Sequence, residues 1–171
     1  MDSRKFLSKD ERSHFEKFLI DRIETDTRNA TMLLTALHSG ARPTELLNLT
    51  WSEINIQTGA IYLKTLKAGR PREIIVPKIV REALSRLKAQ SPERPFDISY
   101  QRMAEIWNAY RPTPSKTLRS LRHSFAMRAY ERTKDLRFVQ RALGHRSLQN
   151  TQIYLEYEYS ASEFKKMMRI R

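Results

Sequence analysis

Several arginines in this sequence are spaced so that they could contact a phosphate group. Arg119 and Arg122 are three residues apart in an expected helix, so they share a face and can straddle a phosphate. Arg42 follows Gly40 at the junction between two expected helices, and Glu45, one turn later, could hold its guanidinium group. Arginine suits this task because its planar fork donates two parallel hydrogen bonds. Taken singly, each of these residues could equally be a solvated surface group.

Other polar side chains stand at places where the chain turns. Lys67 lies on a turn between two expected strands, and the tip of such a turn can reach into a groove. His145 emerges where the chain reverses out of a helix, and Tyr154 follows nine residues later. Tyr157 and Tyr159 compete with Tyr154. A solvated hairpin lysine and a core or interface tyrosine are the ordinary alternatives, so none of these residues decides a function by itself.

The charge balance indicates a polyanionic partner. Lys and Arg number 32 against 19 Asp and Glu, which gives a formal net charge of +13. Residues 111–146 alone hold ten basic side chains and two acidic ones. Nucleic acid is the leading partner for such a chain. An anionic membrane surface is the weaker alternative, because it needs a strongly basic amphipathic helix and the segment 164–170 is too short.

Common catalytic chemistries are missing from the sequence. Cysteine is absent, which excludes disulfides, thiolate metal sites and a cysteine nucleophile. Four scattered histidines argue against a structural zinc site, and the acidic residues do not cluster as a two-metal nuclease requires. There is no Walker loop, HExxH or GxSxG motif. We therefore expect no cofactor, and side chains must supply any positive charge that acts on a phosphate.

Length and hydropathy indicate one globular domain. A chain of 171 residues fits a single domain with a substantial core. No run approaches about 18 apolar residues, so we expect no membrane span. No charged segment is followed by an apolar one at the N-terminus, so no signal peptide is visible. A cytoplasmic protein fits these features.

Apolar residues recur at helical spacing through most of the chain. After a loose end at residues 1–10, the pattern predicts helices within 1–26, over 28–38 and 43–49, from Pro77 through Leu87, from Ser99 to Tyr110, over 116–132, from Asp135 to Gly144, over 148–156 and, as a tail, over 160–171. The period becomes two at Ile54 and Ile56, again at Ile61 and Leu63, and in the segment 72–76. The expected fold class is α+β: one mostly helical domain with a small three-stranded antiparallel sheet.

Four blocks, taken in order, resemble the tyrosine recombinase (phage integrase) family. They are Gly40-Ala41-Arg42-Pro43-Thr44-Glu45-Leu46-Leu47-Asn48-Leu49, a hairpin lysine, Leu121-Arg122-His123-Ser124-Phe125-Ala126, and Leu143-Gly144-His145 with Tyr154. The spacing of nine between the last histidine and the tyrosine is the usual one in the family, and the resemblance covers about residues 10–160. It implies the catalytic set Arg42, Lys67, Arg119, Arg122, His145 and Tyr154, supported by Glu45. Lys64 is the alternative to Lys67, which directly precedes the turn as the family lysine does.

The resemblance implies a site-specific DNA recombinase, of the integrase or invertase type. Tyr154 would attack a scissile phosphate of double-stranded DNA and form a 3′-phosphotyrosine, without metal or ATP. The arginines would neutralise the transition state and Lys67 would protonate the 5′-oxygen. A dimer to tetramer on DNA is expected. The tail would pack on a neighbouring protomer, with packing on its own protomer as the alternative. The rivals are a type IB topoisomerase and a catalytically inactive DNA-binding regulator on the same fold.

Two features depart from the family pattern. The position three residues before the second arginine is usually histidine, sometimes lysine, and here it is Arg119. Arginine can donate to a phosphate oxygen but does not exchange a proton near neutral pH, so only charge stabilisation is expected there. Family members usually carry an N-terminal core-binding domain of about 100 residues, for which this sequence has no room, so residues 1–171 are expected to be the catalytic domain. The sequence fits either an excised catalytic domain or a short recombinase of the kind that inverts promoter segments.

Overall fold

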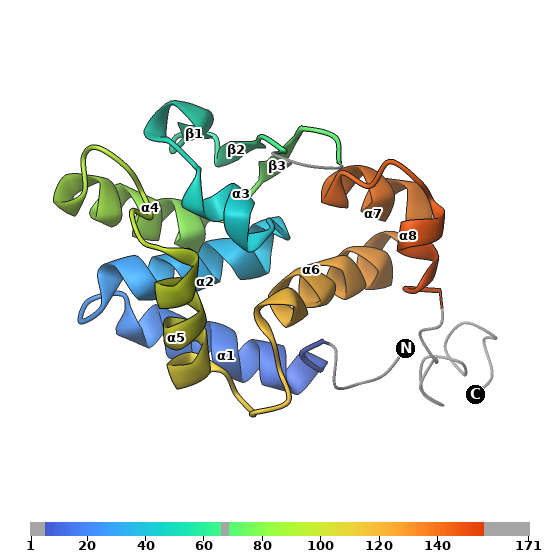
Figure 1. Ribbon diagram of the computed structural model, residues 1–171, viewed down its shortest axis with the longest axis horizontal. Helices are drawn as coiled ribbons and strands as arrows, with labels where there is room; N and C mark the ends of the chain where they lie inside the picture. The colour runs from blue at the N-terminus through green and yellow to red at the C-terminus, as the bar shows by residue number, and fades with distance from the viewer. Residues whose placement is uncertain (1–5, 66–68, 156–171) are drawn as a thin grey trace.

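The computed structural model describes residues 6–65 and 69–155, which form a helical domain with a small sheet at one side (Figure 1). The helices are α1 (Lys9–Arg22), α2 (Thr27–Ser39), α3 (Pro43–Leu47), α4 (Lys78–Gln90), α5 (Tyr100–Tyr110), α6 (Leu118–Thr133), α7 (Leu136–Leu143) and α8 (Gln149–Gln152). A 3-10 turn, η2 (Trp51–Glu53), leads into the strands β1 (Ile54–Asn55), β2 (Ala60–Leu63) and β3 (Arg72–Ile75). The predicted fold class, α+β and mostly helical, is confirmed.

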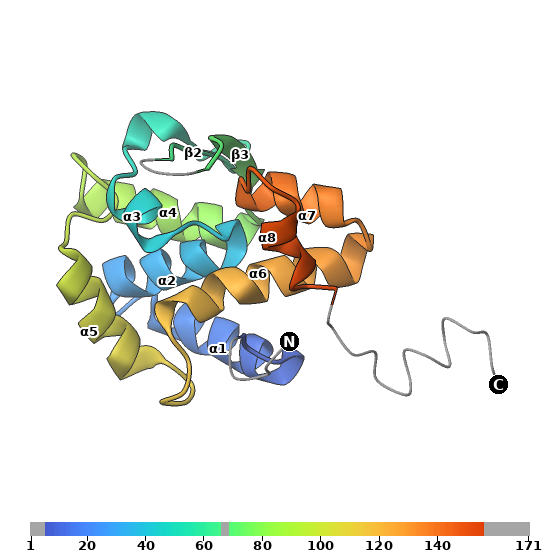
Figure 2. The same cartoon turned by 45° about the vertical axis from the view of Figure 1, so that its right-hand side comes forward.

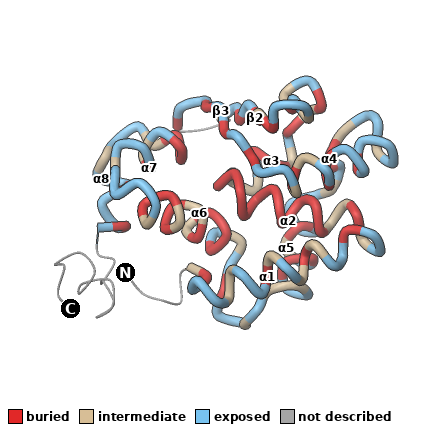
Figure 3. The backbone as a smooth tube through the Cα atoms, turned by 180° about the vertical axis from the view of Figure 1, so that it is seen from behind, coloured by how far each residue is buried: buried red, intermediate tan, exposed pale blue. Residues whose placement is uncertain are grey.

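Helix α2 is the centre of the core. Almost all of its residues are buried, as the red tube in Figure 3 makes visible, and it contacts α1, α4 and α6. Its buried apolar residues, Met32, Leu33, Leu34, Ala36 and Leu37, lie on more than one side of the helix, so several neighbours must cover it, which explains its central place. Its buried Thr35 hydroxyl donates to the Thr31 carbonyl 2.7 Å away, so this polar group adds no unpaired donor to the core.

The sheet is antiparallel, with the strand order β1-β2-β3. In β2, Ile61 and Leu63 face the core while Tyr62 is exposed, which is the alternation that the sequence predicted. Across the β2–β3 pair, Ile61 opposes Ile74 and Leu63 opposes Arg72. This register places an arginine at a core-facing position. The sheet packs against α7, beside the end of α6 (Figure 2).

Two helices, α2 and α7, each end at a glycine whose backbone has the left-handed conformation. Gly40 closes α2 with φ +61°, and its N–H donates to the Ala36 carbonyl. Pro43 then starts α3 at its first position. Gly144 closes α7 in the same way, with φ +67°. Both stops were predicted, because glycine adopts the left-handed conformation without a Cβ penalty.

Both ends of the described chain differ from the sequence-based expectation. The loose end predicted through residue 10 is wrong for its described part: Leu7 is buried, and its N–H donates to the Ser124 hydroxyl at 2.8 Å. The Phe6 carbonyl accepts from the Lys116 ammonium at 2.7 Å, and Ser8 caps α1. The helix predicted over 148–156 is shorter, because α8 is followed by turns that bury Tyr154. The predicted tail helix lies outside the described residues.

A second, smaller apolar cluster supports α6 and α7. Its buried members are Ala126, Met127, Ala129, Tyr130, Val139, Leu143 and Tyr154, with Phe6, Phe125 and Leu136 packed against them. The N-terminal segment and the candidate nucleophile therefore share one packing environment. Among the described helices, none combines the length and the apolar character needed to cross a membrane.

Replacing Gly40 with alanine should lower the free energy of unfolding by about 1–3 kcal/mol. The backbone there has φ +61°, and an added Cβ would lie 2.3 Å from Cδ1 of Phe125. Urea denaturation measures the loss, with Ser85→Ala on an exposed face of α4 as the control. A Gly40→Ala protein as stable as the wild type would contradict this account of the turn.

Candidate active site

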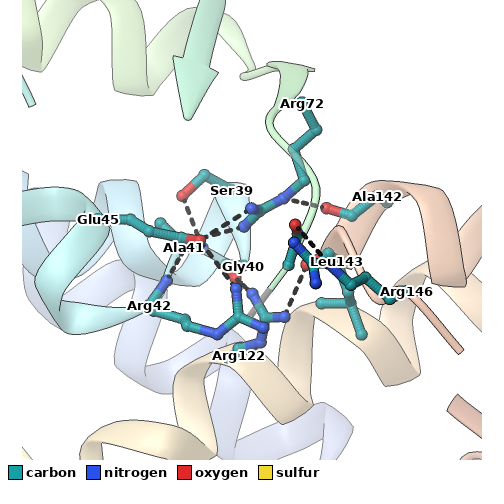
Figure 4. A network of polar contacts seen from close by, with 11 residues as sticks. Ser39, Gly40, Ala41, Arg42, Glu45, Arg72, Arg122, Ala142, Leu143 and Arg146 are labelled. Atoms are coloured by element: carbon teal, nitrogen blue, oxygen red, sulfur yellow. Dashed lines mark hydrogen bonds and ion pairs between the residues drawn. The ribbon is translucent and has the colours of Figure 1, made fainter. Parts of the chain in front are cut away.

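Arg122 is a buried arginine that joins three parts of the chain. It projects from α6, and its two terminal nitrogens donate to the Gly40 carbonyl at 2.6 Å and the Leu143 carbonyl at 2.7 Å (Figure 4). These carbonyls lie at the ends of α2 and α7, where helices leave unpaired oxygens. Burial, with Arg42 and Arg72 nearby, lowers the pKa of Arg122 to about 9. The guanidinium group is therefore fixed in place before any phosphate arrives.

Glu45 is a buried carboxylate shared by two arginines. The Arg42 N–H donates to Oε2 at 2.7 Å, and the Arg42 guanidinium donates to Oε1 at 2.9 Å. Arg72 donates to both oxygens, at 3.1 Å and 2.9 Å. Burial raises the pKa of Glu45, but the hydrogen bond and charge of Arg72 outweigh that effect, so the pKa is lowered. The carboxylate stays ionised and balances part of the local positive charge.

The pair of Arg42 and Glu45 had been predicted from its spacing, but Arg72 had been missed. A signal was present in the sequence. The segment 72–76 alternates, and Arg72 has the parity of Ile74 and Val76, which are buried. A charged residue on the core-facing side of a strand needs a partner, and that partner proved to be Glu45.

His145 stands at the turn after α7, partly buried. Its Nδ1 lies 2.9 Å from the Thr151 hydroxyl of α8, which orients the ring. Burial lowers the pKa of His145 to about 4, and Arg122, Arg42 and Arg72 add to the shift. The imidazole is therefore neutral near pH 7, so it can donate a hydrogen bond to a phosphate oxygen without carrying a charge.

Tyr154 is turned inward in this structure. Its side chain is 1% exposed, and its hydroxyl lies 2.9 Å from Nδ1 of His123. Burial raises the pKa of Tyr154 to about 12, although Arg122 and Arg119 act in the opposite direction. The phenol is protonated and covered in this conformation. His123, within one of the quoted blocks, had not been singled out as a partner.

Arg119 is exposed on α6, one turn before Arg122. Its positive charge acts to lower the pKa of Tyr154, against the larger effect of burial. Lys64, the alternative lysine, does not point into the cluster. It is exposed and pairs with Glu53 at 2.6 Å, which raises the pKa of Lys64. Lys67 itself lies outside the described residues, as do the competing tyrosines Tyr157 and Tyr159.

The chain that follows Lys67 is held against the arginine cluster. The Arg70 N–H donates to the Gly144 carbonyl at 2.9 Å, and Arg146 donates through Nε to the Gly69 carbonyl at 3.2 Å. A Cβ added to Gly69 would lie 3.3 Å from a terminal nitrogen of Arg42. The loop between β2 and β3 therefore returns directly beside Arg42. Within residues 6–65 and 69–155, no group of three or more His, Cys, Asp or Glu is arranged to hold a metal ion.

This architecture is known from solved structures. The crystal structure of XerA recombinase matches with a TM-score of 0.74 at 27% identity, covering 97% of this chain and 65% of that one. The catalytic domain of bacteriophage HP1 integrase matches with a TM-score of 0.68 at 19% identity, covering 98% and 95%. The fold is that of a tyrosine recombinase catalytic domain.

The model of the phage integrase family matches residues 5–160, and the chain belongs to this family. The tyrosine recombinase XerA of Pyrococcus furiosus is 31% identical over an alignment of 153 residues that covers 81% of this chain and 54% of the relative. The tyrosine recombinase XerC of Mesorhizobium japonicum is 31% identical over an alignment of 143 residues that covers 74% of this chain and 46% of the relative. The chain thus spans about half the length of the curated relatives it matches.

His145 should make the fold less stable in acid. The pKa is about 4 in the folded chain, against an ordinary value of 6.5, so the unfolded chain takes up the proton first as the pH falls. This contribution to the free energy of unfolding is complete above pH 6.5 and is lost progressively toward pH 4. Urea denaturation across this range should show a smaller acid loss for His145→Asn than for the wild type. Parallel curves for the two proteins would contradict the assignment.

Proposed function

We propose that this chain is the catalytic domain of a site-specific DNA recombinase that cleaves and rejoins strands through a 3′-phosphotyrosine. The observation that carries the proposal is the convergence of Arg42, Arg122 and His145 from three separate elements, with Tyr154 close enough for the charge of Arg122 to act on it. The curated relatives are named tyrosine recombinases. Among the structures that share this fold, XerH site-specific recombinase is bound to its difH substrate and the Tn1549 transposon integrase is in complex with transposon right end DNA, which supports DNA as the partner.

The arginines and the histidine suit the negative charge of a phosphoryl transition state. A guanidinium group has five N–H donors, so Arg122 keeps donors for a phosphate oxygen beyond its two carbonyl contacts. Arg42 is held by Glu45 with part of its side chain exposed. Arg119 adds charge from the exposed side of α6, and His145 adds a neutral donor. Each such donor typically stabilises the transition state by about 2.7–4 kcal/mol.

Tyr154 supplies the nucleophile in this mechanism. Its hydroxyl leaves His123, gives its proton to solvent water and attacks phosphorus, and the bond from phosphorus to the 5′-oxygen breaks. Lys67 is proposed to protonate that oxygen, since the loop carrying it returns beside Arg42. A 5′-hydroxyl then attacks the phosphotyrosine and releases the enzyme. One phosphate ester replaces another, so the energy of the broken bond is retained.

The proposed assembly is a dimer to tetramer of this chain on DNA, acting in the cytoplasm during integration, excision or inversion. Recombination joins two duplexes, so at least two active sites must meet. The tail at 160–171, whose packing on a neighbour was expected, lies outside the described residues. A type IB topoisomerase would instead relax a supercoiled plasmid without producing recombinants, and an inactive regulator would bind DNA without cleaving it.

Tyr154→Phe should abolish the covalent adduct with DNA and leave DNA binding intact, because only the attacking oxygen is removed. The probe is a library of nicked duplexes with a randomised central segment, in which cleavage beside the nick traps the protein covalently. Peptide mapping of the wild-type adduct should place the nucleotide on Tyr154. Tyr157→Phe is the matched control and should still form adduct. Adduct formed by Tyr154→Phe would contradict the assignment, and wild-type binding without adduct would favour the inactive regulator.

Arg42→Gln should slow adduct formation by about 100-fold while DNA binding changes little, because its charge acts mainly in the transition state. Arg102→Gln is the matched control: Arg102 also bonds a glutamate three residues later, but on the exposed face of α5. Single-turnover rates and binding curves on the duplex trapped by the wild type measure the two effects. Equal losses in binding and cleavage would assign Arg42 to DNA positioning instead.

A further inference from the structure

Arg72 donates hydrogen bonds to three protein oxygens and belongs to none of the sequence blocks that resemble the family. Its side chain is 5% exposed at the start of β3, just beyond the loop that carries Lys67. The two terminal nitrogens donate to the two oxygens of Glu45, and Nε donates to the Ala142 carbonyl at 2.7 Å. One guanidinium group therefore bridges α3 and α7 from β3, as the sticks of Figure 4 make visible.

Each hydrogen-bond partner of Arg72 either contacts a candidate catalytic group directly or lies next to a residue that does. Glu45 holds both the backbone and the guanidinium group of Arg42. Ala142 precedes Leu143, whose carbonyl anchors Arg122, and His145 follows one residue after Gly144. A Cβ added to Gly144 would lie 3.1 Å from Cδ of Arg72, so the arginine also packs against the turn itself.

The geometry distinguishes Arg72 from an arginine that binds phosphate. All three of its side-chain nitrogens, Nε included, donate to protein oxygens and the side chain is buried, whereas the carbonyl bonds of Arg122 are made through its two terminal nitrogens. Arg42 differs, since its side chain is 31% exposed. Arg72 thus acts on the reaction through the residues it holds.

We propose that Arg72 is a positioning residue for strand cleavage. Through Glu45 it holds Arg42, and through the Ala142 carbonyl it holds the end of α7. It thereby fixes the distance from Arg42 to the turn that carries His145 and the carbonyl that anchors Arg122. The inference rests on the proposed function. It requires the planar fork of arginine: a lysine ammonium keeps the charge but cannot bond both oxygens of Glu45 and the Ala142 carbonyl in the same geometry. A phosphate ligand misplaced by about 1 Å can cost 100-fold in rate.

The test compares Arg72→Lys, which keeps the charge, with the wild-type protein. The substrate is the nicked duplex on which the wild type forms its covalent adduct. Near-ultraviolet circular dichroism checks the fold, binding curves give Kd, and single-turnover trapping gives the rate at saturating DNA. We expect a folded protein, a Kd within about threefold of the wild type and a rate lower by about 30-fold or more. Arg94→Gln is the matched control, because Arg94 donates to the Leu47 carbonyl at the far end of α3 and should cleave normally.

A double-mutant cycle separates positioning from general weakening of the fold. If Arg72 acts through Arg42, then Arg42→Gln should cost about 100-fold in the wild type and under 10-fold in the Arg72→Lys background. A cost that is the same in both backgrounds overturns the proposal. So does an Arg72→Lys protein that cleaves within threefold of the wild type, or one that loses its fold, its DNA binding and its rate together. If the wild type itself forms no adduct, the proposed function is overturned. That result differs from failure of the Arg72 proposal alone, because the Arg94→Gln control would then form no adduct either.

Discussion

The arrangement of this domain depends on one ion network. In it, the buried carboxylate of Glu45 lies between the guanidinium groups of Arg42 and Arg72. Gathering several cations in one buried place is unfavourable unless an anion compensates them, and removing one member of a buried pair leaves an uncompensated charge. Helix α3, β3 and the end of α7 therefore cannot drift apart independently. Their hydrophobic faces supply most of the packing energy, but this ion network fixes the distance between them.

The proposed nucleophile, Tyr154, lies in a more apolar environment than the buried cations. Tyr154 is packed with apolar side chains of α6 and α7, and its hydroxyl is bonded to His123. The raised pKa of the phenol follows from that burial, and charge from Arg122 and Arg119 offsets only part of it. The domain holds its cationic groups in position while the Tyr154 hydroxyl is covered. In the proposed mechanism, exposing the tyrosine is therefore a separate step from assembling the charge around the phosphate.

Local patterns in the sequence predicted the parts of the site that depend on near neighbours. The glycine stops, the hairpin and the contact of Arg42 with Glu45 all lie within a few residues and follow from turn and helix geometry. The contacts of Arg122 with Gly40, and of Arg72 with Glu45, span 82 and 27 residues. Those depend on how helices and strands pack, which periodicity does not specify. His123 was overlooked for the same reason, because its partner is 31 residues away.

The anchors of Arg122 have a consequence for how this domain can evolve. Both oxygens that hold its guanidinium group belong to the backbone, at Gly40 and Leu143. A main-chain carbonyl is present whatever side chain the codon specifies, so no substitution deletes either acceptor directly; only a change in the path of the chain does. Substitutions of solvent-facing side chains on the neighbouring helices can therefore accumulate while the position of the Arg122 guanidinium group is inherited unchanged.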